Sequence, residues 1–320
     1  MRPLRIGLAG LGIHGRRYAD HLLAGDVPGA ALGAVSRSDR REGSLFALQN
    51  AVAFAHDPHE LATLPGLDAV AIALPPDLHP PVAIACLEAG RPVLVEKPLA
   101  PDAASAERIA LAAERTGTPL MVAHTLRFDP LIAAVRDEAR RIGRLRMLAL
   151  SQRFEPAGRS WIDTPGRGGT ILNTAVHSFD LLRFLTGAEI VSVTGASRRV
   201  VTRDTEDELA AVVTLEPGGL LATVDNARTT GGRSGRIEIV GEQAQVRADF
   251  VHRELARIEG RTVLPLGVWP PVPTVAAMLA AFVRCLREDA PMPVTARDGA
   301  AAVRACDLAY ASIPARIGRD

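Results

Sequence analysis

Nearly continuous apolar runs alternate with helix-like segments over the first 125 residues of the chain. The helical patterns at 80–89 and 103–116 are each followed by a glycine, the residue most often found just past a helix. Runs that are apolar at every position suit parallel strands buried on both faces, so the alternation predicts a doubly wound α/β sheet. The predicted strands are LRIGLA (4–9), ALGAV (31–35), DAVAIAL (68–74), PVLVE (92–96) and PLMVA (119–123).

The pattern changes after residue 125. A helix is predicted at 130–141, and strand-like runs then follow one another with tight turns between them. The runs at 208–216 and 220–227 flank Pro217-Gly218-Gly219 and predict a β-hairpin. The other strand-like runs are RLRMLALSQRF, EIVSVTGASRRV and GRIEIVGEQAQVRAD.

Two helical segments, at about 273–287 and 298–313, close the chain. Together with the preceding strands they predict a domain of the α+β class, built on an open, mostly antiparallel sheet. We therefore expect an α/β domain at 1–125 and an α+β domain at 126–320.

Composition narrows the classes of function. A formal net charge of +1 and a pI near 7.9 argue against nucleic acids and anionic membranes as partners. No apolar run approaches the roughly 18 residues that span a bilayer. The three cysteines are widely spaced and form no metal-ligand pattern, so we expect no metal site and a cytoplasmic location.

A glycine-rich loop directly follows the first predicted strand. Gly10, Gly12 and Gly15, with Ile13 and His14 before the last of them, form a GxGxxG pattern that opens a helical segment. The first glycine permits a tight turn, the second lets the backbone approach a pyrophosphate, and the third lets the helix pack on the strand. The diphosphate then rests on the N–H groups of the helix N-terminus. This context predicts a Rossmann domain that binds a dinucleotide.

The end of the second predicted strand distinguishes NADP from NAD. An acidic residue there would bind the ribose 2′-hydroxyl, whereas arginine suits a 2′-phosphate. Ser36 and Arg37 occupy this position, and Asp39 comes later, where it could equally cap the next helix. These residues favour NADP and leave NAD as the alternative cofactor. A solvated turn in an arginine-rich chain is the competing interpretation.

Lys97 is the only lysine in a chain that contains 36 arginines. It lies in LVEKP at the end of the fifth predicted strand, and open α/β sheets bind ligands at the carboxyl ends of their strands. An ammonium can lose its proton near neutral pH when desolvated, whereas a guanidinium cannot. Glu96 is expected at the same edge, beside the cofactor, with Leu74, Pro75 and His79 after the fourth strand. The alternative is a surface lysine retained by chance.

A further motif, GRGGTILNTAVHSFDLLRFLTG, lies in the second predicted domain. Asn173, His177 and Asp180 are spaced i, i+4 and i+7 and would share one helix face, and the glycines of GRGG give a flexible approach. We expect Asn173 and Asp180 to contact a substrate. An imidazole titrates near pH 6.5, which suits His177 for proton transfer. Taken alone, His177 could equally be a buried histidine with a satisfied hydrogen bond.

These motifs, with RFDP at 127–130 and DGAAAVRACDLAYAS at 298–312, resemble the glucose–fructose oxidoreductase / inositol dehydrogenase family (Gfo/Idh/MocA oxidoreductases). The resemblance covers nearly the whole chain, and the EKP stretch is its most specific part. It implies a Rossmann domain and an α+β domain whose open sheet carries the substrate pocket and often an oligomer interface. It also implies chemistry on a secondary alcohol or carbonyl of a polyhydroxylated sugar, cyclitol or diol, and a homo-oligomer, either dimer or tetramer.

The resemblance assigns roles to individual residues. Lys97 matches the lysine that hydrogen-bonds the reacting oxygen and touches the cofactor ribose, and His177 matches the general acid/base. Asn173 stands where many members have aspartate, and an amide cannot take a proton or raise the pKa of His177 as a carboxylate would. Trp161 resembles the tryptophan near the nicotinamide, but Ile162 follows it where arginine is common.

The implied reaction moves a hydride between the substrate carbon and the nicotinamide. The hydroxyl proton passes to His177 while Lys97 stabilises the developing negative oxygen. Two other functions share this fold: a non-catalytic protein that senses a dinucleotide, and an NAD-dependent glycosidase. The sensor has little need of Lys97 and His177, and the glycosidase needs tightly held NAD, which Ser36 and Arg37 do not favour.

Overall fold

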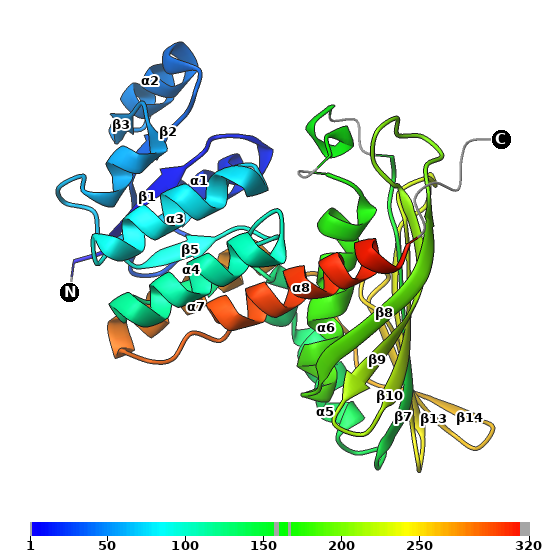
Figure 1. Ribbon diagram of the computed structural model, residues 1–320. Helices are drawn as coiled ribbons and strands as arrows, with labels where there is room; N and C mark the ends of the chain where they lie inside the picture. The colour runs from blue at the N-terminus through cyan, green and yellow to red at the C-terminus, as the bar shows by residue number, and fades with distance from the viewer. Residues whose placement is uncertain (1, 157–159, 166–167, 314–320) are drawn as a thin grey trace. The chain divides into compact units, whose positions relative to one another are not determined.

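Figure 1 shows the computed structural model of the chain. It describes residues 2–156, 160–165 and 168–313, without the side chains of Ser160 and Trp161. The chain forms two compact units. The first comprises Met1–Thr125 and Pro273–Ala300, and the second comprises Leu126–Val272 and Ala301–Asp320.

The first unit is built on a six-stranded parallel sheet with the order β3-β2-β1-β4-β5-β6. Its strands are β1 (Leu4–Ala9), β2 (Ala30–Ser36), β3 (Ala53–Ala55), β4 (Ala69–Ile72), β5 (Val93–Val95) and β6 (Leu120–Val122). The five predicted strands are confirmed. The sequence pattern does not reveal β3, because three residues at a sheet edge are too few to show a period.

Helices pack against this sheet, with α3 beside α4 and α1 beside α7. Aspartate side chains cap three of them: Asp39 accepts from the Glu42 N–H at the start of α2, Asp57 from the His59 N–H at the start of η1, and Asp102 from the Ser105 N–H at the start of α4. The helices are α1 (Ile13–Ala24), α2 (Arg40–Gln49), the short η1 (Pro58–Ala62) and η2 (Pro76–Leu78), α3 (His79–Glu88), α4 (Ala103–Thr116), α7 (Thr274–Glu288) and the beginning of α8 (Ala296–Ser312).

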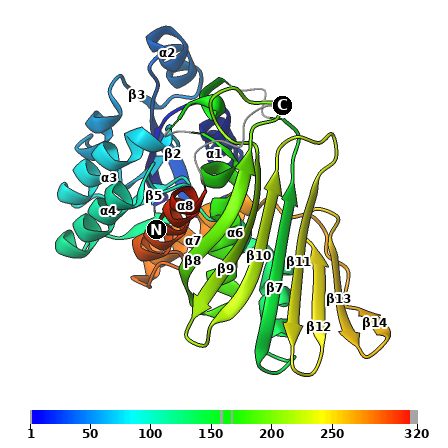
Figure 2. The ribbon, with the colours of Figure 1, turned by 45° about the vertical axis from the view of Figure 1, so that its right-hand side comes forward.

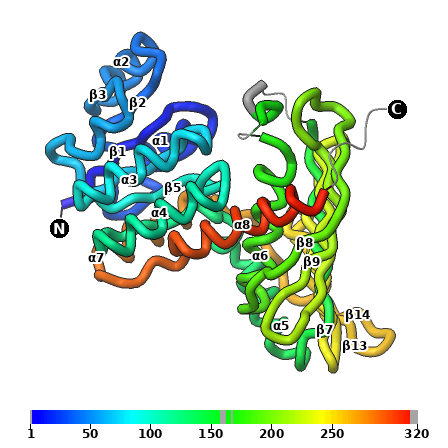
Figure 3. Tube along the Cα trace, in the orientation of Figure 1, coloured from blue at the N-terminus to red at the C-terminus, as the bar shows by residue number. Residues whose placement is uncertain are grey.

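The segment Pro273–Ala300 belongs to the first unit, although the sequence pattern assigns it to the second domain. Figure 3 traces α7 among the helices of the first unit. The guanidinium of Arg287 on α7 donates to the carbonyl oxygens of Arg2 and Gly29, each at 2.8 Å. These partners are 285 and 258 positions away along the chain, so no local pattern could reveal the contact.

The parallel register brings the carboxyl ends of the strands level at one edge of the first sheet. Ala9 at the end of β1 pairs with Ser36 of β2 and with Ile72 of β4, and Ile72 pairs with Val95 of β5. The loops after these four residues therefore open at the same edge, where doubly wound sheets bind their ligands.

The second unit is built on an eight-stranded sheet with the order β14-β13-β12-β11-β7-β10-β9-β8, as Figure 2 shows. All neighbours are antiparallel except β7 and β10, which are parallel. The predicted hairpin is confirmed, because Leu215 pairs with Leu220 across its turn. The strands are β7 (Leu145–Arg153), β8 (Glu189–Arg198), β9 (Glu208–Glu216), β10 (Leu220–Ala227), β11 (Ser234–Gly241), β12 (Gln245–Asp249), β13 (Glu254–Glu259) and β14 (Thr262–Pro265).

Helices cover one face of this second sheet. Along β9 the buried Leu209, Ala211, Val213 and Leu215 alternate with more exposed residues, so one face is apolar and the other meets solvent. Helix α6 contacts β7 and β8, and α5 contacts β12 and β13. The helices are η3 (Thr125–Phe128), α5 (Pro130–Ala139), η4 (Ser160–Asp163), the π-helix η5 (Ile171–Ala175), α6 (Val176–Thr186) and the rest of α8. A Rossmann-type sheet followed by a mostly antiparallel one confirms the predicted fold class.

Candidate active site

The three glycines of the first loop have distinct surroundings. Gly10 has φ +97°, and a Cβ there would lie 2.6 Å from the Ala73 carbonyl oxygen. A Cβ on Gly15 would lie 2.0 Å from the Gly10 carbonyl oxygen, so α1 packs directly on the loop. A Cβ on Gly12 would meet no heavy atom within 4 Å. The second glycine therefore borders open space, which is the fit that a diphosphate requires.

Two side chains flank this open space at the start of α1. Ile13 is the first residue of the helix and is exposed, and His14 is half-buried. The positions of Ile13 and His14 do not indicate a role for either side chain in the reaction. The helix has Gly12 as its N-cap and no acidic residue in its first turn, so nothing in that turn opposes the binding of an anion.

Of the two residues expected at the 2′ position of the cofactor, only Arg37 reaches the surface. Ser36 is buried at the end of β2. The Arg37 guanidinium donates to the Leu11 carbonyl in the glycine loop and pairs with Glu42, which also binds Arg16 at 3.0 Å. Arg37 therefore lies beside the glycine loop, but its guanidinium already pairs with the Glu42 carboxylate, which would compete with a 2′-phosphate.

The loop after β5 places Lys97 beside a buried carboxylate. Lys97 is half-buried, and its backbone N–H donates to Glu96 Oε2 at 3.0 Å. The other oxygen, Oε1, accepts from the Tyr18 hydroxyl at 2.8 Å. Burial raises the pKa of Glu96, and the positive charge of Lys97 lowers it. Glu96 thus holds the Lys97 backbone rather than opening toward a cofactor.

His79 connects the loops that follow β4 and β5. Its Nε2 lies 2.8 Å from the Leu74 carbonyl oxygen, and its Nδ1 lies 2.9 Å from the Pro98 carbonyl oxygen. The ring is buried, and burial lowers the pKa of His79 although the backbone carbonyls raise it. Leu74 and Pro75 are half-buried at the strand end. His79 therefore fixes the loop edge instead of pointing at a ligand.

In the second unit, Asn173 and His177 lie on consecutive helical segments of different type. Asn173 is buried in η5, and its side-chain amide donates to the Gly169 carbonyl oxygen at 3.2 Å. His177 is in the first turn of α6 and is the only residue of 171–182 that is not fully buried. The i, i+4 spacing of the two residues thus runs from a π-helical turn into an α-helix.

Asp180 has a protein partner in place of the expected substrate hydroxyl. Its Oδ2 accepts from Arg127 Nε at 2.9 Å, and its Oδ1 accepts from Arg127 Nη2 at 2.6 Å. The aspartate side chain is 2% exposed and the arginine side chain 9%. Arg127 belongs to the RFDP motif and Asp180 to the motif at 166–187, so one ion pair links these two sequence motifs. Both carboxylate oxygens of Asp180 therefore bind Arg127 in a buried environment.

The glycines at 168 and 169, before η5, allow close packing. A Cβ on Gly168 would lie 1.6 Å from the Ile162 carbonyl oxygen. Gly169 has φ +86°, and its Cβ would lie 2.3 Å from Glu206 Oε1. Gly166 is outside the described residues.

Trp161 belongs to η4, but its side chain is outside the described residues. The next residue, Ile162, is buried. Its carbonyl oxygen accepts from the Gly169 N–H at 2.9 Å and from the Thr205 hydroxyl at 3.1 Å. The Ile162 backbone thus anchors the segment before η5, and its apolar side chain suits this buried position better than an arginine side chain would.

Glu206 and Tyr310 form a hydrogen-bonded contact that no sequence motif predicts. Glu206 Oε1 accepts from the Ile171 N–H at 2.9 Å and from the Tyr310 hydroxyl at 3.0 Å. Ile171 is the first residue of η5, so this pair fixes the helix that carries Asn173. Burial raises the pKa of Glu206. The one available signal was rarity, because the chain has only two tyrosines.

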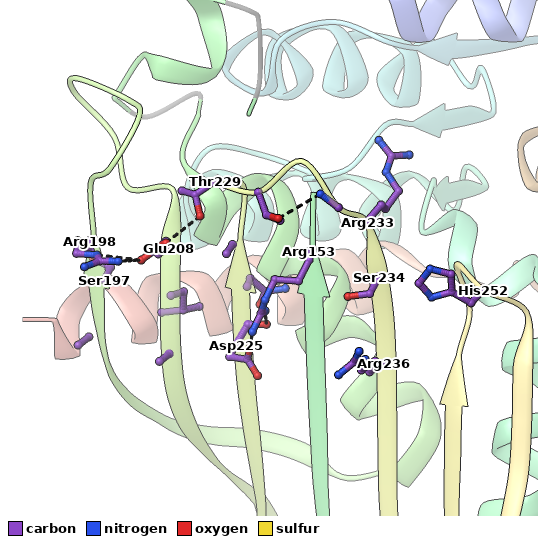
Figure 4. A pocket seen from close by; sticks show the side chains of 17 residues that line it. Arg153, Ser197, Arg198, Glu208, Asp225, Thr229, Arg233, Ser234, Arg236 and His252 are labelled. Atoms are coloured by element: carbon purple, nitrogen blue, oxygen red, sulfur yellow. Dashed lines mark hydrogen bonds and ion pairs between the residues drawn. The ribbon is translucent and has the colours of Figure 1, made fainter. Parts of the chain in front are cut away.

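A separate hollow of about 900 Å³ lies on the open face of the second sheet (Figure 4). Ion pairs between neighbouring strands line it: Arg198 with Glu208 at 2.7 Å, and Arg153 with Asp225. None of the predicted site residues lines this hollow. Over the described ranges, no group of three or more His, Cys, Asp or Glu could hold a metal ion, and no helix is long and apolar enough to cross a membrane.

Both parts of the chain match models of known protein families. Residues 4–124 match the model described as "Oxidoreductase family, NAD-binding Rossmann fold", and residues 134–247 match the "GFO/IDH/MocA C-terminal domain". Inositol 2-dehydrogenase 1 of Saccharopolyspora erythraea is 36% identical over 257 residues, which cover 76% of this chain and 73% of the relative.

Two further proteins show the same likeness. The scyllo-inositol 2-dehydrogenase (NAD(+)) of Bacillus subtilis is 30% identical over 254 residues, covering 76% of this chain and 73% of its own length. The crystal structure of an oxidoreductase domain protein from Kribbella flavida superposes with a TM-score of 0.88 at 25% identity, covering 98% of this chain and 97% of the other.

Proposed function

Because the chain belongs to the Gfo/Idh/MocA oxidoreductases and is a dehydrogenase acting on CH–OH groups, we propose that it uses NADP to oxidise a hydroxyl of a cyclitol, sugar or related diol, or to reduce the matching carbonyl. The relatives named inositol dehydrogenases make cyclitols the first substrates to test. NAD is the competing cofactor.

The first unit has the features that hold a dinucleotide. Gly12 leaves room for the diphosphate at the N-terminus of α1, and the Arg37 guanidinium offers a positive charge for a 2′-phosphate. Two observations weigh toward NAD: Glu42 pairs with Arg37, and the Bacillus subtilis relative is named for NAD(+). When bound, the nicotinamide accepts or supplies the hydride.

Lys97 is proposed to donate a hydrogen bond to the reacting substrate oxygen. Its backbone is held by Glu96, and it follows a strand whose end is level with the glycine loop. A half-buried ammonium stabilises negative charge that develops on an alcohol oxygen more strongly than one in bulk water does.

His177 is proposed to hold the proton that the substrate hydroxyl loses, or to return it in the reverse reaction. It is the partly exposed residue in an otherwise buried stretch, so it can meet a substrate. Asn173 is proposed to orient a substrate hydroxyl, and Trp161 to border the same pocket. Asp180 is proposed to act only through Arg127, since both its oxygens are engaged.

We assign dinucleotide binding to the unit that contains residues 1–125, and substrate binding and self-association to the one that contains 126–272. The protein is proposed to work in the cytoplasm as a homo-oligomer, either a dimer or a tetramer. Sedimentation equilibrium would decide this, and a monomer at micromolar concentration would contradict it.

The observation that carries the proposal is Lys97 fixed at the sheet edge where Gly12 leaves open space. The test follows absorbance at 340 nm with NADP and NAD in parallel, over inositol isomers, aldoses, polyols and simple diols. We expect turnover with a cyclitol or sugar. In Lys97→Met this turnover should be at least about 100-fold slower, which is the lower end of the effect of losing an acid–base group.

Nucleotide binding provides the matched control. Lys97→Met should still quench or enhance NADPH fluorescence as the unchanged chain does, because Gly12 and Arg37 are intact. Turnover that persists in Lys97→Met would contradict the assigned role. Lack of turnover over the full panel, from a folded protein that binds NADPH, would contradict the substrate class.

A further inference from the structure

Tyr18 and Glu96 form a buried polar pair that hydride transfer does not itself require. Tyr18 is on α1, the helix that the glycine loop opens, and it is 1% exposed. Glu96 is 8% exposed at the end of β5. A phenylalanine could fill the Tyr18 position with equal apolar contact. Burying a hydroxyl and a carboxylate costs free energy unless each is paired, so the pair needs a specific reason.

Two hydrogen bonds converge on the Glu96 carboxylate, one from the Tyr18 side chain and one from the Lys97 backbone. The Tyr18 hydroxyl donates to Glu96 Oε1 at 2.8 Å, and Glu96 Oε2 accepts from the Lys97 N–H at 3.0 Å. Each carboxylate oxygen thus receives one donor, which suits the ionised form. These two hydrogen bonds connect α1, the helix that follows the proposed dinucleotide loop, with Lys97, the proposed catalytic residue.

We propose that Tyr18 is a positioning residue for the reaction: through Glu96 it fixes the backbone at Lys97 and keeps a negative charge beside the lysine ammonium. This inference rests on the proposed role of Lys97. It assigns Tyr18 and Glu96 to the control of charge and geometry at Lys97, and not to contact with substrate or cofactor.

Burial and the neighbouring groups act in opposite directions on the charge of Glu96. Two positive charges act on Glu96: Lys97 in its own loop and Arg17 on α1. The neutral Tyr18 hydroxyl acts on Glu96 through its hydrogen bond. Burial is the largest effect and raises the pKa of Glu96 above its ordinary value, while Lys97, the Tyr18 hydrogen bond and Arg17 each lower it. Loss of the Tyr18 donor therefore favours the neutral carboxyl and frees it to turn. Lys97 then loses its anionic neighbour, and its ammonium gives up the proton at lower pH.

The test uses the fact that Lys97 is the only lysine in the full chain. Amine acylation by acetic anhydride, measured on the Lys97 peptide by mass spectrometry over pH 6–11, reports the protonation of this one side chain without any need for turnover. We expect the midpoint to fall by about one pH unit in Glu96→Gln, and by a smaller amount in Tyr18→Phe.

Kinetics give the second readout. In Tyr18→Phe we expect kcat to fall about tenfold, while KM and the dissociation constant of NADPH change less than threefold. In the Glu96→Gln background Tyr18→Phe should have no further effect, because the hydroxyl acts only through that carboxylate. The matched control is Thr118→Val, which removes another buried hydroxyl bond, from Thr118 Oγ1 to the Leu87 carbonyl at 3.1 Å. It should leave both readouts unchanged.

The outcomes separate this inference from the proposed function. An unchanged acylation midpoint in Tyr18→Phe, or independent kinetic effects of Tyr18→Phe and Glu96→Gln, would overturn the role of Tyr18. A shifted midpoint in a protein with no dehydrogenase activity would support the hydrogen-bonded chain and refute the activity instead. A Tyr18→Phe variant that unfolds would be replaced by Glu96→Gln, whose midpoint must still fall.

Discussion

Arg127 and Asp180 form a bidentate ion pair that is almost completely removed from solvent. Nε and Nη2 of the arginine lie 2.9 and 2.6 Å from the two carboxylate oxygens. The pair joins the segment before α5 to the middle of α6, one turn beyond His177. It therefore orders the helix that carries the proposed acid/base.

Asp180→Asn should destabilise the protein by about 3 kcal/mol, because the buried guanidinium keeps only one acceptor. Urea unfolding would measure the loss. The matched control is Asp137→Asn, which breaks an exposed pair with Arg140 and should cost less than about 0.5 kcal/mol. Equal losses in the free energy of unfolding for the two substitutions would show that the buried pair stabilises the protein no more than the exposed one.

Lys97→Arg should retain NADPH binding and lose most turnover, by roughly 100-fold or more. The guanidinium keeps the charge, but it is larger and planar and cannot release a proton. Nucleotide titration and steady-state kinetics on the same sample would compare the two properties. Near-normal kcat in this variant would mean that charge alone suffices at position 97.

Asn173→Asp should move the acidic limb of the pH–rate profile for alcohol oxidation toward higher pH. A carboxylate near His177 favours the imidazolium, so the neutral base forms only at higher pH. The new side chain also loses the amide that donates to the Gly169 carbonyl, so some loss of stability accompanies the shift. A profile that keeps its acidic limb would show that positions 173 and 177 are electrostatically independent.

Gly169→Ala should destabilise the second unit by about 2 kcal/mol or more. Its φ of +86° is unfavourable for alanine, and the Cβ would lie 2.3 Å from Glu206 Oε1. Gly231→Ala is the control, since a Cβ there meets no heavy atom within 4 Å. Thermal unfolding of both variants should show a large shift for position 169 only.

Glu206→Gln should gain stability relative to the unchanged chain as pH rises from 5 to 8. Burial raises the pKa of Glu206 above that in the unfolded chain, so its contribution is complete below about pH 4.5 and is lost as pH rises through the folded value. Glutamine keeps an acceptor for Ile171 and Tyr310 and does not titrate. Unfolding free energies at pH 5, 6, 7 and 8 would test the trend.

Features that depend on neighbours along the chain could be predicted before the fold was known. Gly10, Gly12 and Gly15 stand at fixed offsets from the first strand, and α4 spans the predicted residues 103–116. The LVEKP stretch places Lys97 at a strand end. Backbone sterics, caps and apolar periodicity act over a few residues, so they can be read locally.

The three-dimensional fold was needed to show which polar side chains pair and which segments share a unit. The Tyr18–Glu96 bond spans 78 positions and the Arg127–Asp180 pair 53, while α7 joins the first unit from more than 250 positions away. It also decided that Asn173 stands in a π-helix and that Asp180 binds an arginine. Hydrogen bonds and ion pairs depend on distances of about 3 Å between atoms, and such distances are set by packing and not by order along the chain.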